Sequence, residues 1–483
     1  MFDSALDAIV PILCVTLAAL ASMAAEAFRG KGERMPIGGL GIVGLVGAGI
    51  SAALLWNRNA PSMSAEVPVI VADNFGLFVT LILVIVGILT IMFSSQVVER
   101  DGLPAGEYYA LVLFSIAGMM MMATANDLLV IFIALEIMSL SVYVLTGLRR
   151  DDMRGTEGAF KYFLLGAFSS AFFLYGIAFT FGLTESTRLD VIRSYMAAHS
   201  MSGNPLILLA AGLLLVGFAF KISAVPFHMW TPDAYEGAPA IVTGFMSTGV
   251  KAAAFAAFAR VFLSPFEPFS ADWAPVIWIL AVATMILGTV VGVAQSNLKR
   301  MLAYSSIAHG GYLLVGLVSA NQVGKAAILF YLLAYAVTNL AAFGVIAMLG
   351  SRERANDELR DYSGLWHRHP ALGALMTVCL LSLGGLPPTA GFIGKWYIFS
   401  AAVSSGYYGL AIIGVLTSVI SVFFYLRVVV MMYMAEGEPS AAPVRLSRLG
   451  MTALAISIAA IFYLGILPTF ILDLAADSIA TIF

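Results

Sequence analysis

Charge is scarce in this sequence. Only 11% of its 483 residues are Asp, Glu, Lys or Arg, less than half of the roughly 25% found in soluble domains, and 61% are hydrophobic. Apolar stretches of about 20 residues, the length at which a helix crosses a bilayer, recur from one end of the chain to the other. No polar stretch between them is long enough to form a soluble domain. The sequence therefore predicts an all-α polytopic membrane protein.

Cysteines and cofactor motifs are also scarce. The two cysteines, Cys14 and Cys379, lie in apolar stretches without a neighbouring cysteine or histidine, so we expect inert buried thiols and neither a disulfide nor a metal site. The sequence lacks a P-loop, a haem-ligand pattern and iron–sulfur cysteines, and it therefore predicts no cofactor bound by this chain. Basic runs are no longer than Arg149–Arg150, so we expect no nucleic-acid partner.

One glycine pattern imitates a nucleotide-binding motif. Gly39, Gly41 and Gly44 match the dinucleotide fingerprint, but that motif requires a preceding strand and a helix N-terminus. Here the glycines lie inside an apolar stretch, where small residues let helices approach closely. The N-terminal stretch differs from a signal peptide, because Asp3 and Asp7 stand where positive charge is needed. We therefore expect the three glycines to serve helix packing, and the N-terminal stretch to be a retained first helix.

Fourteen apolar stretches are predicted to span the membrane, and Lys and Arg are distributed unevenly between them. Fifteen of these basic residues lie in connections after odd-numbered spans, and five lie in connections after even-numbered spans. Because basic loops remain in the cytoplasm, both termini should face the outside of the membrane. The predicted spans are approximately 5–27, 37–56, 74–95, 107–123, 127–147, 157–183, 205–227, 238–262, 274–295, 301–320, 324–350, 371–402, 407–434 and 449–474.

Two of these spans carry helix-breaking residues. The seventh contains Pro226, Pro232 and Pro239 in KISAVPFHMWTPDAYEGAP, and the twelfth contains Pro387 and Pro388 in SLGGLPPTAGFIGKW. Proline removes a backbone donor, and the carbonyl groups that it frees inside a membrane need protein or water partners. We therefore expect discontinuous helices 7 and 12.

The two breaks lie five spans apart, and an odd offset inverts the second copy relative to the first. Spans 4–8 and 9–13 would then form two inverted five-helix repeats, and paired interruptions of this kind mark transport sites. The alternative is two unrelated proline kinks. The expected organisation is N-terminal helices 1–3 (1–104), a first repeat (105–265), a second inverted repeat (266–436) and a C-terminal helix 14 (437–483).

Ionisable residues fall inside several apolar spans, where charge is costly unless it is paired or neutralised. Glu136 lies in the fifth span, and Lys221 precedes the break of the seventh. Burial disfavours a charged lysine and a nearby carboxylate favours it, so a Glu136–Lys221 pair whose separation changes would bind and release a proton. Lys251 lies mid-span between small residues, and Lys395 follows the second break. We expect these four residues to transfer protons. A structural hydrogen bond for Glu136 and snorkelling of Lys221 to an interface are the alternatives.

Other titratable residues allow two interpretations each. Lys161 lies near the start of span six, where its position fits both a snorkelled lysine and a relay residue. Arg427 is always charged, so we expect it to anchor its helix at an interface. His228 at the first break and His309 in span ten titrate near neutral pH and are candidate relay residues, with an ordinary polar contact as the alternative. Side chains placed to hold ordered water, or simply to pack, are Tyr304, Tyr312, Tyr335, Ser305, Ser306 and Thr338.

Together these segments resemble the antiporter-like membrane subunits of respiratory complex I, the bacterial NADH–quinone oxidoreductase. The similarity covers roughly residues 105–435. Lys395 and the lack of a long C-terminal extension are similar to the subunit N branch of that family. Asn297 departs from the acidic residue that many relatives carry, so no role is transferred to it. The similarity rests on the Glu136 and Lys251 spans and on KISAVPFHMWTPDAYEGAP, QSNLKRMLAYSSIAHGGY and LSLGGLPPTAGFIGKWYIF.

The resemblance implies a proton-translocating subunit without redox groups of its own. NADH, flavin, iron–sulfur clusters and quinone would belong to partner subunits, and their chemistry would drive protonation changes here. The partners would include related antiporter-like subunits and small helical subunits. Glu136, Lys221, Lys251 and Lys395 would form the titrating axis, with protons arriving from the cytoplasm near Lys221 and leaving near Lys395. The competing interpretations are a subunit of a multisubunit cation/proton antiporter and a structural scaffold, and the cost of buried charge argues against the scaffold.

Overall fold

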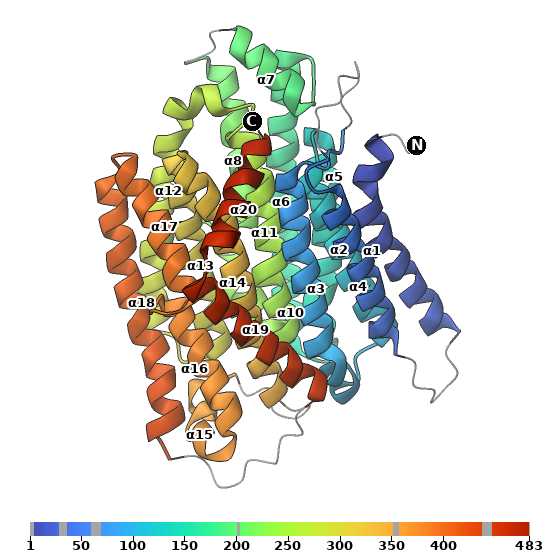
Figure 1. Cartoon of the computed structure of the whole chain (residues 1–483), viewed down its shortest axis with the longest axis vertical. Helices are drawn as coiled ribbons and strands as arrows, with labels where there is room; N and C mark the ends of the chain where they lie inside the picture. The colour runs from blue at the N-terminus through green and yellow to red at the C-terminus, as the bar shows by residue number, and fades with distance from the viewer. Residues whose placement is uncertain are drawn as a thin grey trace.

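The computed structural model describes residues 4–28, 36–58, 69–199, 203–350, 357–436 and 447–482. Within these ranges the chain is all-helical apart from three isolated β-bridges, as Figure 1 shows. Twelve of the described helices are long and apolar enough to cross a membrane, and they coincide with twelve of the fourteen predicted spans. The prediction of an all-α membrane protein is confirmed. Some basic residues used to predict the orientation lie outside the described ranges: Arg29, Lys31, Arg34, Arg352, Arg354 and Arg445.

The helices follow one another with short connections. The first part of the chain forms α1 (Ser4–Ala27), α2 (Ile37–Leu55), α3 (Asn74–Asp101), α4 (Ala105–Thr124), α5 (Leu128–Thr146), α6 (Met153–Thr184), α7 (Leu189–Ala198), α8 (Pro205–Lys221), α9 (Trp230–Gly237), α10 (Ala240–Phe245), the π-helix η1 (Met246–Val250) and α11 (Lys251–Phe262). The second part forms η2 (Glu267–Phe269), α12 (Ser270–Val293), α13 (Leu298–Ser319), α14 (Gln322–Leu349), η3 (Leu359–Tyr362), α15 (Leu365–Arg368), α16 (Pro370–Gly384), α17 (Ala390–Ser404), α18 (Tyr408–Met434), α19 (Arg448–Ile466), α20 (Thr469–Ile479) and η4 (Ala480–Ile482).

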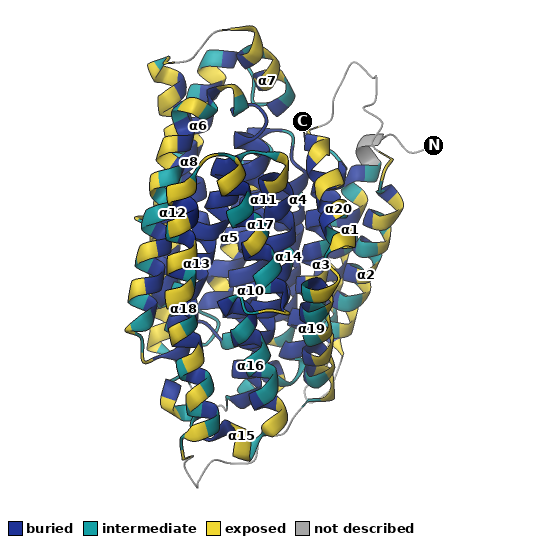
Figure 2. Cartoon of the chain, turned by 60° about the vertical axis from the view of Figure 1, so that its left-hand side comes forward, coloured by how far each residue is buried: buried dark blue, intermediate teal, exposed yellow. Residues whose placement is uncertain are grey.

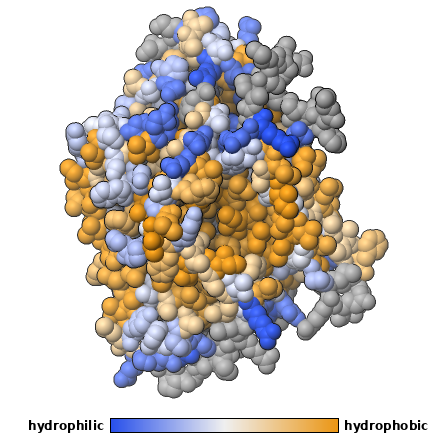
Figure 3. Space-filling view, in the orientation of Figure 1, coloured by the Kyte–Doolittle hydropathy of each residue, from blue (hydrophilic) through white to orange (hydrophobic). Residues whose placement is uncertain are grey.

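The helices form a buried centre and an apolar outer ring. Helices α3, α10, α11, α13 and α14 are almost entirely buried, whereas α1, α2, α6, α12, α18 and α19 expose much of their surface, as the outward yellow faces in Figure 2 show. The visible surface carries a hydrophobic band between two more polar ends (Figure 3). Exposed apolar surface on this scale fits contact with lipid or with other membrane helices. Polar side chains are therefore expected in the centre of the bundle and at its two ends.

The chain leaves helical geometry after Lys221, in the predicted seventh span. Helix α8 ends there, and α9 does not begin until Trp230. A side chain caps the buried end of α8, because the indole Nε1 of Trp230 donates to the Phe220 carbonyl at 3.0 Å. Ser223 adopts a left-handed backbone conformation with φ of 63°, and its hydroxyl accepts a hydrogen bond from Thr231 at 2.7 Å. The prolines thus produce two short helices that side chains join.

A similar interruption occurs in the predicted twelfth span. Helix α16 ends at Gly384, Gly385 closes it with φ of 83°, and α17 begins at Ala390. A Cβ atom at Gly391 would lie 1.8 Å from the Ser382 carbonyl oxygen, so this close approach of α17 to the end of α16 requires glycine. The two parts of the span therefore pack directly against each other.

Two other regions differ from the sequence-based expectations. The predicted last span, 449–474, is wrong in its extent: α19 ends at Ile466 and α20 begins at Thr469, because Pro468 between them has no N–H to continue the ladder. The predicted polar connection after span six contains the amphipathic helix α7. It buries Leu189, Ile192 and Met196, at spacings that place them on one face. In Figure 1, α1 begins and α20 ends near the end of the molecule that carries α7.

Candidate functional site

The first group of candidate residues surrounds the amine of Lys221 at the end of α8. Lys221 is 3% exposed. Its Nζ donates to the Ser139 hydroxyl of α5 at 2.8 Å and to the Tyr162 hydroxyl of α6 at 3.1 Å. The rings of Tyr143 and Tyr162 lie 5.3 and 5.0 Å from the amine, within the range of a cation–π contact. Hydroxyl groups and aromatic faces therefore hold this amine.

Glu136 lies beside this group but does not pair with Lys221. Its carboxylate accepts a hydrogen bond from the Ser170 hydroxyl of α6 at 2.5 Å. Among the described residues, no ion pair joins Glu136 to Lys221. The expected direct pair is therefore absent, because the lysine reaches Ser139, one helical turn farther along α5, while the carboxylate turns to α6.

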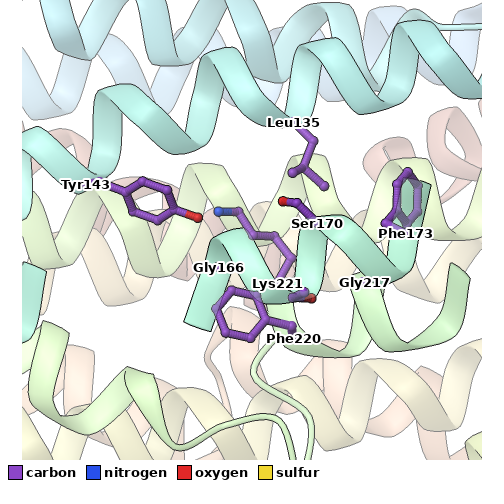
Figure 4. A pocket seen from close by; sticks show the side chains of 9 residues that line it. Leu135, Tyr143, Gly166, Ser170, Phe173, Gly217, Phe220 and Lys221 are labelled. Carbon is purple, nitrogen blue, oxygen red and sulfur yellow. The ribbon is translucent and has the colours of Figure 1, made fainter. Parts of the chain in front are cut away.

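A small cavity connects the two halves of this group. Lys221, Tyr143 and Ser170 line it, together with Gly166 and five apolar or small residues of α5, α6 and α8. Figure 4 shows the Lys221 amine directed toward the Tyr143 hydroxyl, with Ser170 close by. The space is just large enough for one water molecule. A water here would bridge the lysine to Ser170 and thus to Glu136.

Lys251 forms the second group, in the middle of the buried bundle. It follows the π-helix η1 directly, and such single π-turns are frequent at functional sites. Its Nζ donates to the carbonyl oxygen and the hydroxyl of Ser306 on α13, at 2.5 and 2.7 Å. A Cβ atom at Gly310 would lie 3.1 Å from the Ile222 carbonyl and 3.7 Å from the Lys251 amine. Gly310 thus lies between the first helix break and Lys251.

Lys395 forms the third group, at the second helix break. Its Nζ donates to the Leu383 and Gly384 carbonyls at 2.8 and 3.0 Å and to the Ser418 hydroxyl at 2.8 Å. The side chain is 5% exposed. The lysine therefore satisfies the carbonyl groups that the break leaves without helical partners, as a membrane interior requires.

His309 links the second and third groups. The ring of Tyr335 lies 5.0 Å from the His309 ring and 5.9 Å from the Lys251 amine. The ring of Tyr312 lies 5.5 Å from the His309 ring and 5.1 Å from the Lys395 amine. The imidazole therefore has an aromatic neighbour in common with each lysine.

The hydrogen bonds of His309 are made with tyrosines. Its Nδ1 lies 2.6 Å from the Tyr331 hydroxyl, and its Nε2 lies 3.3 Å from the Tyr425 hydroxyl. Tyr425 is also hydrogen-bonded to Ser305, which neighbours the serine that holds Lys251. A water-sized cavity adjoins this group, and it is lined by His309, Tyr331, Ala334, Tyr335, Thr338, Ser382, Leu383 and Gly391.

Lys161 belongs to a separate, more exposed cluster. Its Nζ donates to the Asp233 carboxylate of α9 at 2.7 Å and pairs with Glu157 at 2.6 Å. Arg300 of α13 binds the second oxygen of Asp233 at 2.7 Å and Glu236 at 2.8 Å. Asp233 thus accepts hydrogen bonds from both Lys161 and Arg300. A cavity of about 250 Å³ opens among these side chains.

Two further candidates lie apart from the lysine groups. His228 lies in the first break, and its buried Nδ1 has no hydrogen-bond partner among the described residues. Arg427 donates to the Val293 and Gln295 carbonyls at 3.0 and 2.7 Å. It therefore caps the C-terminal end of α12.

Comparison with known proteins connects this arrangement to one family. A family model described as NADH:quinone oxidoreductase/Mrp antiporter, transmembrane, matches residues 125–421. The NADH-quinone oxidoreductase subunit N of Trichlorobacter lovleyi is 45% identical over 99% of this chain and 97% of its own length. Subunit N 2 of Rhizobium meliloti is 42% identical over 98% of this chain and 97% of its own length. This chain belongs to the NADH-quinone oxidoreductase subunit N family.

Solved structures share the fold of this subunit N family member. A chain of respiratory complex I from Thermus thermophilus has a TM-score of 0.80 and 34% identity, covering 96% of this chain and 99% of that one. A chain of the Mrp complex from Dietzia has a TM-score of 0.84 at 21% identity, covering 98% of this chain and 97% of that one. The second likeness concerns the fold alone.

The sequence-based reasoning for this subunit N family member missed several polar partners. Ser139, Ser170 and Tyr162 hold the Glu136 and Lys221 side chains. Ser139 was detectable, since it lies three residues after Glu136 and therefore on the same face of α5. Lys299 was assigned to a connecting loop, yet it is buried and donates to the Glu236 and Ala238 carbonyls at 2.5 and 2.8 Å.

The cysteines of this subunit N family member lie far apart in the sequence. An iron–sulfur cluster takes four cysteine ligands in its common form, whereas Cys14 lies in α1 and Cys379 in α16. Among the described residues no group of three or more His, Cys, Asp or Glu side chains is placed to hold a metal ion.

Proposed function

We propose that this chain moves protons across the membrane as a non-redox subunit of an NADH-quinone oxidoreductase. The observation that carries the proposal is the environment of Lys221, Lys251 and Lys395. Each amine is at most 5% exposed and is bonded to hydroxyl or carbonyl oxygens. A buried ammonium group without a carboxylate partner is costly to keep charged. A small change in its surroundings is therefore enough to bind or release a proton.

The path of the protons follows the order of the three lysine groups. In this account protons reach Lys221 from the cytoplasm, pass to Lys251 past Gly310, and continue by way of His309 to Lys395 and the periplasm. Glu136, through Ser170, adjusts the charge next to Lys221. The aromatic neighbours that His309 has in common with both lysines support this order. His228 and Lys161 lie at the margins of the path.

The two helix breaks support an inverted-repeat organisation. We assign 105–265 and 266–436 to the repeats, with 1–104 and 437–483 as flanking helices. The first break follows Lys221, and the second provides the carbonyl groups that bind Lys395. Discontinuous helices at matched positions are typical of transport sites near the mid-plane of a membrane. With both termini in the periplasm, α9 then extends from the mid-plane toward the cytoplasm.

The driving energy comes from other subunits in this account. NADH, flavin, iron–sulfur clusters and quinone belong to those partners, and oxidation of NADH and reduction of quinone there change the charge near Glu136. The apolar outer faces of the helices fit neighbouring antiporter-like and small helical subunits as well as lipid. The chain thus lies in a bacterial inner membrane.

A cation/proton antiporter subunit is the second candidate, because the matching family model also covers Mrp antiporters. Affinity purification of the tagged full-length chain from its native membrane separates the two. A complex with flavin and iron–sulfur absorbance, which acidifies inverted vesicles when NADH is added, supports the proposal. A cofactor-free assembly that exchanges cations for protons without NADH contradicts it.

A further inference from the structure

We propose that the stacked rings of Tyr162 and Trp230 form a gate between a cytoplasmic vestibule and Lys221, and that the Lys161–Asp233 ion pair clamps this gate shut. The inference rests on the proposed function, because it identifies where proton access to Lys221 is controlled. Three features carry it: a polar cavity, a dry aromatic pair and an ion pair that joins the same two helices.

The vestibule is the cavity of about 250 Å³ at the ends of α6, α9 and α13. Its volume has room for several water molecules at about 30 Å³ each. Glu157 and Arg154 are exposed at its rim, so water reaches it from outside. Acidic and basic groups alternate on its wall, which is formed by Arg154, Glu157, Gly158, Asp233, Glu236, Gly237 and Arg300.

The gate lies between this vestibule and the Lys221 amine. The rings of Tyr162 and Trp230 are stacked with centroids 3.9 Å apart and planes 2° from parallel, which leaves no room for water between them. Both side chains are at most 2% exposed. The bond from Trp230 Nε1 to the Phe220 carbonyl fixes the indole to the end of α8, and the Tyr162 hydroxyl accepts a hydrogen bond from Lys221 on the inner side.

The two residues of the clamp lie close in the sequence to the two rings. Lys161 directly precedes Tyr162 on α6, and Asp233 follows Trp230 by three residues on α9, so their 2.7 Å bond ties the two helices beside the stack. A Cβ atom at Gly158 would lie 2.7 Å from the Asp233 carbonyl oxygen, which shows how closely these helices pack.

Breaking the bond between Asp233 and Lys161 would open the gate. The charged groups that face this carboxylate are Lys161, Glu157 and Arg154 from α6, Arg300 from α13 and Glu236 from α9 itself. Without the charge-assisted bond to Lys161, Asp233 no longer ties α9 to α6. The contact between α6 and α9 then loosens, and water gains access to the Tyr162 hydroxyl.

Thiol accessibility in inverted vesicles tests the gate in the assembled complex. In a background with Cys14→Ser and Cys379→Ala, single cysteines are placed in the vestibule (Glu157→Cys) or beyond the stack (Ser139→Cys). The probe is Ag⁺, which is close to water in size, and its reaction is read as protection from later maleimide labelling. With the gate intact, we expect the cysteine at position 139 to react about tenfold or more slowly than that at 157, because a closed state leaves about 0.1–10% open.

Variants of the stack decide the assignment. Trp230→Ala, or Trp230→Leu if the alanine variant fails to assemble, should raise the reaction rate at position 139 about tenfold. Trp230→Phe should leave it slow. Trp366 stacks on Tyr433 at 4.9 Å and 23° elsewhere in the bundle, so Trp366→Ala is the matched control and should have no effect. Equal rates at 139 and 157 with the stack intact would overturn the gate.

The clamp is tested by Asp233→Asn in the same assay. Asp190→Asn, which breaks the Arg188–Asp190 pair of α7, is its control. A higher rate at position 139 for Asp233→Asn alone supports the clamp, and an unchanged rate refutes it. The assay needs no NADH and no proton pumping. Pumping with an open gate would refute this inference alone, whereas a closed gate without pumping would refute the proposed function alone.

Discussion

Lys221 donates a 2.8 Å hydrogen bond to Ser139, although the carboxylate-bearing Glu136 lies one turn from Ser139 on α5. The carboxylate binds Ser170 instead. The carboxylate and the amine therefore bond to different serines, and Lys221 and Ser170 both line a water-sized cavity. This separation allows a proton to move between them without first breaking a tight ion pair.

Replacement of Ser139 by alanine should slow proton translocation. The variant removes an acceptor from a buried amine, and an unsatisfied buried group costs about 1–3 kcal/mol, which corresponds to about a fivefold or larger change in a rate or an equilibrium. Ser141→Ala is the control, because the Ser141 hydroxyl donates to the Ile137 carbonyl of its own helix at 2.9 Å. NADH-driven acidification of inverted vesicles measures both, and equal rates in the two variants would contradict the role of Ser139.

Two replacements of Lys395 should distinguish its structural role from its role in proton transfer. Lys395→Arg keeps a cation for the Leu383 and Gly384 carbonyls but cannot release a proton, so we expect normal assembly with loss of this chain's pumping. Lys395→Met leaves both carbonyls without that donor and should also destabilise the purified complex, by about 1–3 kcal/mol for each unsatisfied group. Thermal unfolding in detergent and vesicle acidification distinguish these effects. Full pumping by the arginine variant would show that Lys395 carries no protons.

The buried ion pair between Arg260 and Asp73 should contribute strongly to the stability of the protein. Arg260 binds both oxygens of Asp73 at 2.6 and 2.7 Å and also donates to the Ala123 carbonyl. Arg260→Met leaves a buried carboxylate unpaired, which costs about 3–5 kcal/mol, and it should lower the thermal midpoint clearly.

Two further variants check this interpretation. Arg188→Ala breaks an exposed pair and should cost under about 1 kcal/mol. Adding Asp73→Asn to Arg260→Met should restore part of the loss, because the unpaired charge is then gone. A double variant less stable than Arg260→Met alone would contradict the account.

The sequence predicted the membrane helices well because apolar length alone determines them. It also placed Lys221, Lys251 and Lys395 inside the protein, since charge within an apolar stretch has few alternatives. It did not predict that Lys221 binds Ser139, because that contact depends on the rotation of α8 against α5. The prediction of a continuous last span was wrong because it followed the hydrophobic pattern, which continues beyond Pro468. The proline itself indicated the end of α19.

The charged vestibule was also beyond prediction from sequence. Its residues come from α6, α9 and α13, separated by up to 146 positions from Arg154 to Arg300, and only the packed helices bring them together. Lys161, which binds Asp233 of its wall, was noted in advance, and its position fitted two roles equally well. The structure shows that its partner is Asp233, which the sequence alone did not indicate.

The central claim is that buried lysines carry the protons, and Lys251→Met tests it most directly. Lys251 is 2% exposed and, among the residues that the structure describes, its amine bonds only to Ser306. Lys325, which pairs with Glu267, provides the matched Lys325→Met control. The measurement is the number of protons moved per NADH oxidised in inverted vesicles, with assembly checked on the same membranes. The account predicts that Lys251→Met loses this chain's whole contribution to that ratio and that the control keeps it. An undiminished ratio in a normally assembled Lys251→Met complex would contradict the account.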